Sequence, residues 1–423
     1  MGGRGVVLKG ESIVCLSITP WETHLPSSGH YLMREFARTN RVLFVDRPLS
    51  VKDLWTHRQN AEMAERTART LRRENPLRSW GIDGLDGWVL TPPPTLPING
   101  LDSGILYDSG FEANAQVLRR SIRWAMEQLG MRDPILWISF ELPMGAGLLG
   151  TLGESLSAYH CFDEVLGEPY LARHGPELER ILFERTELVF ATSRKLAQDR
   201  ASIRPDIVYV PNGVDFETFH RALDPDLAIP DEFRAIPGPR IGYLGNLESR
   251  VDYALIERIA LKRPDWSIVL VGPSEGYWQE KLSIMGKLPN LYVMGKRPPS
   301  EAPAILKAFD AAMIPFVRSP QTEAIYPLKL NEYLAAGKAV VMTPFADLRE
   351  FQEVAWIAPD GDAFLAALEE AIRPADPDLV RKRWLMAQQN DWRDRAAQIA
   401  QVLAQRLSAR PPGRWLEGRR NLA

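Results

Sequence analysis

Cysteine and histidine are scarce in this chain, and the scarcity excludes two classes of protein. The only two cysteines, Cys15 and Cys161, each lie inside an apolar run. This is typical of small core residues in a reducing compartment and cannot supply a disulfide framework. The six histidines show no spacing suited to zinc. We therefore expect neither a disulfide scaffold nor a zinc site.

Long apolar runs and an excess of one charge are also missing. No stretch approaches the roughly 18–20 apolar residues of a membrane-spanning helix, and the glycine-rich segment 1–10 lacks the apolar core of a signal peptide. The net charge of −3 gives no general reason to expect a nucleic-acid partner. We expect a cytoplasmic protein, with peripheral contact to the inner membrane face as an open alternative.

Signature motifs of several enzyme classes do not occur. There is no Gly-x-Ser-x-Gly elbow and no Walker-type phosphate loop. Asp224-Pro225-Asp226 and Asp376-Pro377-Asp378 formally match a metal-binding pattern, but both lie in proline-rich connections without an adjacent strand. Turn formation explains them better, so we predict no metal ligand.

What is present is an alternation of short apolar, β-branched runs with helical stretches. In the first half the expected strands are 12–18, 41–46, 88–91, 135–139, 158–161, 188–191 and 207–210. In the second half they are 240–244, 267–271, 291–294, 311–315, 339–343 and 354–357. Such alternation predicts parallel, doubly wound α/β sheets buried on both faces. We predict two Rossmann-like domains facing each other across a cleft, with ligands beyond the carboxyl ends of the strands.

Proline and acidic residues suggest the domain boundaries. They are concentrated at 224–239, which is typical of a linker. We therefore divide the chain into a first domain (1–223), this linker, a second domain (240–385) and a C-terminal helical segment with a tail (386–423). Helices are expected between the strands and near the end, at 31–39, 113–129, 176–185, 252–261, 278–285, 302–308, 328–336, 380–388 and 392–407.

The segment from Tyr326 to Val341 is the most informative part of the sequence. Pro327 suits the first position of a helix, and Gly337 suits the residue just past its end. Lys329 and Glu332 stand three apart on one helical face, near free N–H groups that attract anions. This fits a phosphorylated, hydroxyl-bearing ligand. The alternative is an ordinary amphipathic helix with a surface ion pair.

Two motifs, taken with the predicted domains, resemble one family. Pro211-Asn212-Gly213-Val214-Asp215 and Glu332-Tyr333-Leu334-Ala335-Ala336-Gly337 look like those of retaining glycosyltransferases of the GT-B fold, family 4 type, and most like bacterial enzymes of surface-polysaccharide synthesis, the teichuronic-acid type included. The resemblance implies an acceptor-binding first domain and a second domain that binds a nucleotide-diphosphate sugar without a metal. It also implies a last helix, near Trp392, that returns to the first domain.

The resemblance assigns roles to two carboxylates. Glu332 would accept hydrogen bonds from the nucleotide ribose hydroxyls, a task that suits a carboxylate. The family usually has another glutamate eight residues earlier, in contact with the transferred sugar, and here that position is Ala324. Either the neighbouring Glu323 fills this catalytic role through a shifted loop, or the role is absent.

The loop after the first strand of the second domain is the expected diphosphate site. Its glycines, Gly245 among them, let the backbone approach a phosphate closely. The family often places an arginine and then a lysine in this loop, and here those positions are Asn246 and Arg250. One of the two charges is therefore missing.

Lys329 is placed in sequence to replace the missing charge. We predict that Arg250 and Lys329 bind the diphosphate and stabilise it during catalysis. Pro327 and Leu328 would bring the start of the helix to the same donor site. Arg250 as an exposed surface residue is the alternative.

The first domain offers candidates for both substrates. Ser28 and Gly29, before an expected helix at 31–39, take the place of a Gly-Gly turn in the family and would bring backbone N–H groups to the phosphate or sugar. Trp21 and His24, just past the first strand, would face the acceptor, although His24 is as well explained as a surface histidine.

Two carboxylates follow later strands of the same domain. Glu141 stands where relatives commonly have a histidine, and it is an acceptor-side candidate. Asp163, at the end of another strand, either orients the acceptor or caps the segment that follows it.

A basic segment between Trp55 and Trp80 carries six arginines and several glutamates. Spacings of four, as in Glu62–Arg66, are typical of an exposed helix with many salt bridges. The alternative is an arm that contacts anionic lipid headgroups, because acceptors in such pathways are often lipid-linked. The arginines are Arg58, Arg66, Arg69, Arg72, Arg73 and Arg78.

The sequence thus predicts a metal-independent, retaining glycosyltransferase that moves a sugar from a nucleotide-diphosphate sugar to a glycan, lipid-linked or small-molecule acceptor. Two alternatives remain. One is a nucleotide-sugar 2-epimerase on the same fold. The other is a non-catalytic module that binds glycans or partner enzymes, which the residues at Ala324 and Asn246 favour.

Overall fold

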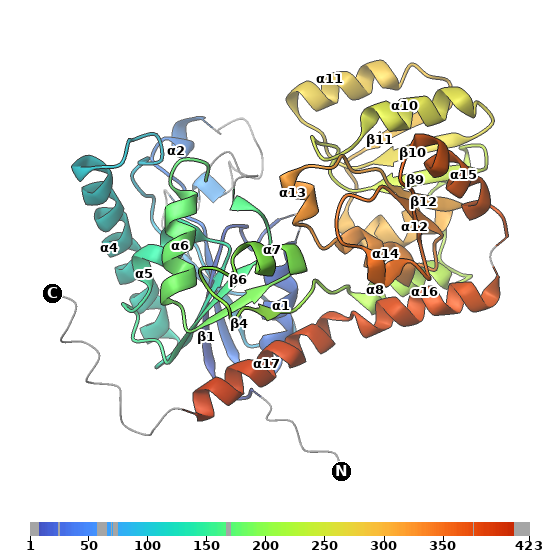
Figure 1. Ribbon diagram of the computed structural model, residues 1–423. Coiled ribbons are helices and arrows are strands. Elements are labelled where there is room, and N and C mark those ends of the chain that lie inside the picture. The colour runs from blue at the N-terminus through green and yellow to red at the C-terminus, as the bar shows by residue number, and fades with distance from the viewer. Residues whose placement is uncertain are drawn as a thin grey trace, which may run out of the picture. The chain divides into compact units, whose positions relative to one another are not determined.

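The chain folds into two compact units, each with its own sheet. The computed structural model describes residues 8–409 apart from 24–25, 57–65, 69, 71–74, 166–170 and 375. The first unit contains the chain up to Val210 and again from Arg395 on, and the second runs from Pro211 to Asp394. Figure 1 shows the helices and strands of each unit.

The first unit is built on eight strands in the order β3-β4-β2-β1-β5-β6-β7-β8. Only β3 runs antiparallel, against β4. The strands are β1 (Ser12–Ser17), β2 (Arg41–Asp46), β3 (Leu77–Ser79), β4 (Gly87–Leu90), β5 (Ile135–Ser139), β6 (Leu156–Cys161), β7 (Leu188–Ala191) and β8 (Val208–Tyr209). The helices named below are α1 (Ser28–Phe36), α2 (Asp53–Thr56), α4 (Ile105–Gln128), α5 (Leu142–Leu148), α6 (Gly175–Arg185) and α7 (Arg194–Asp199).

The second unit has six parallel strands in the order β11-β10-β9-β12-β13-β14. They are β9 (Arg240–Leu244), β10 (Ser267–Val271), β11 (Leu291–Gly295), β12 (Ala311–Ile314), β13 (Val340–Met342) and β14 (Trp356–Ile357). Its helices are α8 (Phe216–His220), α9 (Asp231–Arg234), α10 (Tyr253–Lys262), α11 (Gly276–Met285), α12 (Ala302–Ala308), α13 (Pro320–Glu323), α14 (Leu328–Ala335), α15 (Gly361–Ala371) and α16 (Pro377–Gln389). Helix α17 (Trp392–Ser408) begins in this unit and belongs to the first unit from Arg395 on.

The order of strands in each sheet reverses at one place. In the first unit it reverses between β1 and β5, and in the second between β9 and β12. The loops that leave these neighbouring strands run in opposite directions, which opens a crevice at the carboxyl edge of the sheet. The loops after β1, β5, β9 and β12 are therefore the places to look for a site.

The predicted α/β class and parallel sheets are confirmed, because central strands that are buried on both faces are continuous apolar runs. Strands β2, β5, β7, β9 and β10 begin and end where the sequence predicted. The predicted start of the long helix at 113 was wrong, since α4 begins at Ile105. Helix α5 was not predicted, because Pro143 and two glycines give its short sequence a low helix propensity. A Cβ at Gly145 would lie 2.7 Å from Ile138 Cγ2, so tight packing on β5 overrides helix propensity there.

The predicted linker at 224–239 was also wrong. It lies inside the second unit, where Phe233 and Ile236 are buried in the core. The chain instead passes between the units at Val210 and Pro211. Proline and acidic residues were misleading here because they build turns on the surface of a unit as readily as they build linkers.

Candidate active site

Helix α14 brings two ionisable side chains to the carboxyl edge of the second sheet. Pro327, predicted to be its first helical residue, is instead its N-cap, with an extended backbone (φ −75°, ψ 111°), and Leu328 begins the helix. Gly337 has a φ of 70° just past the last turn, as its predicted role requires. Lys329 and Glu332 are both half-buried.

The Lys329 side chain lies against the loop after β9. A Cβ atom on Gly245 would lie 1.9 Å from Lys329 Cε, so the lysine stem occupies the space that this glycine leaves open. Its Nζ atom lies 5.7 Å from the centre of the Tyr243 ring and 5.9 Å from that of Phe316. Burial lowers the pKa of Lys329, and the Glu332 carboxylate acts in the opposite direction.

The Glu332 carboxylate lies less than one helical turn from Lys329, yet the two side chains form no ion pair with each other or with any other residue that the structure describes. Burial raises the pKa of Glu332. Lys329 opposes this increase, and the Asp215 carboxylate adds to it. The alternative of a surface ion pair is therefore wrong. Half-buried charges without a partner are costly, and here they fit an external ligand.

Tyr333 fixes this helix to the end of β9, a role that the sequence analysis missed. The Leu244 N–H donates to the Tyr333 hydroxyl at 2.8 Å, and this hydroxyl donates to the Leu244 carbonyl at 3.0 Å. Gly272 supports the same loop, because a Cβ there would lie 1.9 Å from the Gly245 carbonyl oxygen. The sequence offered one signal for this role: Tyr333 brings a hydroxyl, which needs a hydrogen-bond partner, to a position on the buried face of the helix.

The loop after β9 also carries Arg250 and Asn246, the two positions predicted to bind the donor. Arg250 is half-buried, and its Nε donates to Glu248 Oε1 at 2.6 Å. Its charge is thus partly balanced within the loop, and it lies near enough to Lys329 to lower the pKa of that lysine. The Asn246 Oδ1 atom is buried without a hydrogen-bond partner among the described residues. Arg250 is therefore not the fully exposed residue of the alternative interpretation.

We expect Gly245→Ala to weaken both the fold and donor binding. A side chain at φ 149° is strained, and its Cβ would displace Lys329. The cost should be about 1–3 kcal/mol of unfolding free energy, with at least about tenfold weaker binding of UDP or GDP. Gly276→Ala is the matched control, because φ there is 53° and a Cβ meets nothing within 4 Å. Denaturation and calorimetry measure both effects, and native affinity in Gly245→Ala would contradict this account of Lys329.

The carboxylate proposed to replace the missing glutamate is already engaged. Glu323 ends the four-residue helix α13, and its Oε1 accepts a hydrogen bond from Arg318 Nε at 2.6 Å. The side chain of Ala324 is buried. A catalytic role for Glu323 stays a prediction, and it requires the carboxylate to leave Arg318.

The segment Pro211–Asp215 supports α14 from within the second unit. Asn212 Nδ2 donates to the Tyr326 carbonyl at 3.1 Å, just before the helix. Asp215 caps α8 through the Thr218 N–H at 3.2 Å, and its charge raises the pKa of Glu332. In the sequence this motif stands out only through its resemblance to the family, and its contacts give it a positioning role.

In the first unit, Ser28 and Gly29 form the first turn of α1, which begins earlier than the predicted residue 31. Both are buried. A Cβ on Gly29 would lie 2.4 Å from Ser139 Oγ, so the helix packs directly on the end of β5. The ring of His30 completes the cap: its Nδ1 accepts from the Ser27 N–H at 3.1 Å, and its Nε2 lies 2.9 Å from the Pro20 carbonyl.

Aromatic rings surround the loop after β1. Trp21 stacks on Trp80, with ring centres 3.9 Å apart, and the backbone N–H of Trp21 donates to Asp46 Oδ1 at 2.8 Å. Burial lowers the pKa of His30, which lies 5.6 Å from the Trp21 ring, to about 4. His24 lies outside the described residues, so its acceptor-side role stays a prediction.

Glu141 lies two residues after the end of β5, at the N-cap of α5. Only 2% of it is exposed. Burial raises the pKa of its carboxyl group, and Arg47 acts in the opposite direction. Both residues line a cavity within the first unit, so the structure brings this acceptor-side candidate to a hollow rather than to packed core.

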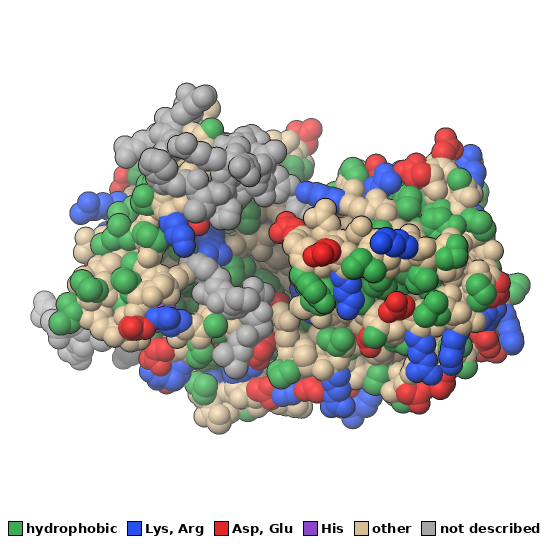
Figure 2. Space-filling view, turned by 90° about the horizontal axis from the view of Figure 1, so that it is seen from above, with side chains coloured by type: hydrophobic (Ala, Val, Ile, Leu, Met, Phe, Trp, Pro, Cys, Tyr) green, Lys and Arg blue, Asp and Glu red, His purple; other side chains and the backbone are tan. Residues whose placement is uncertain are grey.

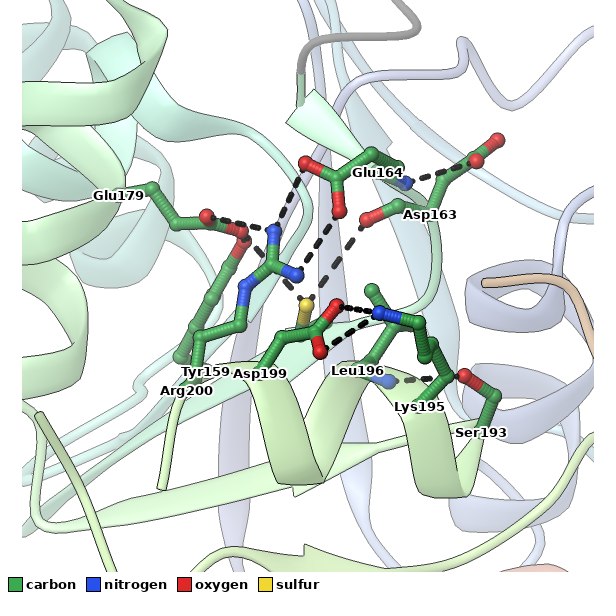
Figure 3. A network of polar contacts seen from close by, with 10 residues as sticks. Tyr159, Asp163, Glu164, Glu179, Ser193, Lys195, Leu196, Asp199 and Arg200 are labelled. Atoms are coloured by element: carbon green, nitrogen blue, oxygen red, sulfur yellow. Dashed lines mark hydrogen bonds and ion pairs between the residues drawn. The ribbon is translucent and has the colours of Figure 1, made fainter. Parts of the chain in front are cut away.

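Asp163 lies at the edge of a buried polar network (Figure 3). Its Oδ1 accepts the Glu164 N–H at 2.8 Å, which fits the capping alternative. The Arg200 guanidinium binds both oxygens of Glu164 at 2.8 and 2.9 Å and also Glu179 at 3.2 Å. The Tyr159 hydroxyl donates to Glu179 at 2.9 Å. This network, which the sequence analysis missed, fixes the loop that carries Asp163.

Most of the predicted basic arm lies outside the described residues, including Arg58, Arg69, Arg72 and Arg73. Of its other members, Arg78 pairs with Glu22 at 3.0 Å and donates to Thr91 at 2.9 Å. Arg66 donates to the Arg47 carbonyl.

In the described part of the chain no helix is long and apolar enough to cross a bilayer. Among the same residues, no three His, Cys, Asp or Glu side chains gather as a metal site requires.

Comparison with known proteins finds a family match within the second unit. Residues 238–374 match the family model for glycosyl transferases group 1. The chain is 31% identical over 195 residues to TuaH of Bacillus subtilis, whose name assigns it to teichuronic acid biosynthesis as a glycosyltransferase. The match covers 45% of this chain, and the chain spans about half (48%) of the length of that curated relative.

Solved structures share the whole architecture at low sequence identity. Sucrose-phosphate synthase from Thermosynechococcus elongatus has a TM-score of 0.67 at 13% identity, over 95% of this chain and 100% of that one. HepE from Anabaena, in complex with UDP and glucose, has a TM-score of 0.62 at 15% identity, over 93% and 99%. These likenesses establish the fold. The chain therefore has the GT-B fold, and its second unit contains a group 1 glycosyltransferase domain.

Proposed function

We propose that this protein transfers a sugar from a nucleotide-diphosphate sugar bound in its second unit. The observation that carries the proposal is the pair formed by Lys329 and Glu332. Both are half-buried, form no ion pair or hydrogen bond with another described side chain, and lie where the strand order reverses. A diphosphate requires a cation, and paired ribose hydroxyls require an acceptor. The family match over 238–374 supports the same donor.

The finer features of the reaction are part of this proposal. Lys329, the N–H groups at the start of α14 and Arg250 would stabilise the charge that develops on the leaving diphosphate, so catalysis would come mainly from positioning and electrostatics. The resemblance adds retained anomeric configuration without a metal. The acceptor would be a glycan, a lipid-linked molecule or a small molecule, and the name of TuaH favours cell-surface polysaccharide synthesis, with the enzyme at the cytoplasmic side.

Calorimetry with UDP and with GDP tests the proposal on the native protein. Binding of one of them is expected, because a donor site must hold the leaving nucleotide. A non-catalytic module would bind neither, and that result would overturn the proposal. Incubation with UDP-GlcNAc alone separates the epimerase alternative, because an epimerase converts its substrate without an acceptor and a transferase does not.

Removal of divalent cations should leave the reaction unchanged. If Lys329 and Arg250 replace a metal at the diphosphate, the rate of sugar transfer after dialysis against EDTA should stay within about twofold of the untreated rate. Rates with and without added Mg²⁺ or Mn²⁺ measure this. A loss that only a divalent cation restores would contradict metal independence and leave the transferase proposal standing.

A further inference from the structure

The first unit contains a cavity of about 730 Å³ that the donor site does not use. Helices α4 and α5 supply most of its apolar wall, through Phe111, Leu118, Met144 and Leu148, and Ile98 adds to it. A volume of a few hundred cubic ångströms and a mostly apolar lining are typical of a small-molecule site. The cavity is therefore large enough for more than trapped water.

One end of this cavity is polar and lies at the carboxyl edge of the sheet. Glu141 follows β5 and Arg47 follows β2, the strands on either side of β1. Lys52 and Asp53 line the same cavity, and Asp53 accepts the Ser50 N–H at 2.8 Å. The cations complement an anionic group, and the buried Glu141 carboxyl can contact a hydroxyl.

Exposed apolar residues occur in the cavity lining and at the start of the helix that forms part of its wall. Leu96 lines it while 49% exposed, and Asn114 holds Leu96 through hydrogen bonds of 2.8 and 3.1 Å to its backbone. A few residues on, Ile105 and Leu106 open α4 with exposures of 84% and 77%, the highest of any large hydrophobic residue described. In Figure 2 hydrophobic side chains lie among mixed charges on the first unit, at the left.

We propose that this cavity binds the hydrocarbon chain of a lipid-linked acceptor, with the polar head toward Arg47 and Glu141 and with Ile105 and Leu106 in the membrane surface. This rests on the proposed transferase function and specifies its acceptor. Water-exposed isoleucine and leucine at a helix start are unfavourable, and entry into a lipid surface removes that cost. A free sugar would cover neither the apolar wall nor these side chains, whereas an amphiphile matches both ends.

Filling the cavity tests the lipid site. Leu118→Trp adds bulk to the cavity wall, and Val117→Trp, at a 37% exposed position on the same helix, is the matched control. The native protein and Val117→Trp should bind dansyl-labelled undecanoic acid, and Leu118→Trp should bind it about tenfold more weakly. No binding by the native protein, or native-like binding by a folded Leu118→Trp, would overturn the proposal.

A surface variant tests the membrane contact without touching the core. Ile105→Glu with Leu106→Glu should lower co-sedimentation with phosphatidylcholine vesicles about tenfold. Leu261→Glu with Ile284→Glu, at apolar positions of the second unit that are 63% and 61% exposed, should not. Equal sedimentation of both variants would count against it, as would a native dimer that only the first variant dissociates, since the patch would then be a protein interface. UDP and GDP binding, measured on the same samples, reports separately on the donor site.

Discussion

Replacement of Glu332 by alanine is expected to abolish sugar transfer while the protein stays folded. A hydrogen bond to a charged group contributes about 1.5–3 kcal/mol, and the paired ribose hydroxyls would lose two. Affinity for UDP or GDP should therefore fall by roughly 100-fold to 10,000-fold. The free energy of unfolding should stay the same or rise, because the substitution removes a half-buried carboxylate that has no partner among the described residues.

The opposite signs of these effects make the Glu332 variant informative. A residue with a purely structural role would lower stability and activity together, whereas a ligand-binding carboxylate lowers activity alone. Glu257→Ala on α10 is the matched control, since this glutamate is exposed in the same unit. Calorimetry, transfer assays and thermal denaturation give the three readouts. Unchanged turnover in Glu332→Ala would remove the central claim about the donor site.

The strands that surround both sites could be predicted because each is a continuous apolar run with turn residues at its ends. The sheet order then follows from parallel pairing and places the loop after β9 beside the connections after β12. The predicted linker failed for a physical reason: Phe233 and Ile236 are buried, and two apolar side chains in a proline-rich stretch give no clear period.

The candidate donor site was only partly predictable, because contacts between distant residues decide it. The spacing of Lys329 and Glu332 indicated their shared face. Nothing in the sequence, however, indicated that the Lys329 stem would occupy the space beside Gly245. The hydroxyl of Tyr333 at a buried helical position indicated that it needs a partner, but not that this partner is the backbone of Leu244. The Glu248 partner of Arg250 was visible two residues away and was overlooked.

Replacement of Lys329 by methionine should cost the reaction about 100- to 1,000-fold in kcat, the loss typical of one group that stabilises transition-state charge. Methionine keeps most of the apolar stem beside Gly245 and removes the ammonium, so the fold should be as stable or more stable. Lys262→Met, on the exposed end of α10, is the control. Transfer rates at saturating donor measure the effect, and a native rate in Lys329→Met would assign the diphosphate to other groups.

The pH dependence of nucleotide binding tests the same lysine without removing it. Burial lowers the pKa of Lys329 from its ordinary 10.5, and only the protonated form attracts a diphosphate. Affinity for UDP or GDP should therefore be greatest below this lowered pKa and fall as the pH rises through it, where the phosphates are already fully ionised. Arginine stays charged throughout. In Lys329→Arg the affinity for UDP or GDP should therefore decrease less as the pH rises, even if the affinity itself is lower. The same decrease in affinity at high pH in Lys329→Arg and in the native protein would mean that a different group titrates.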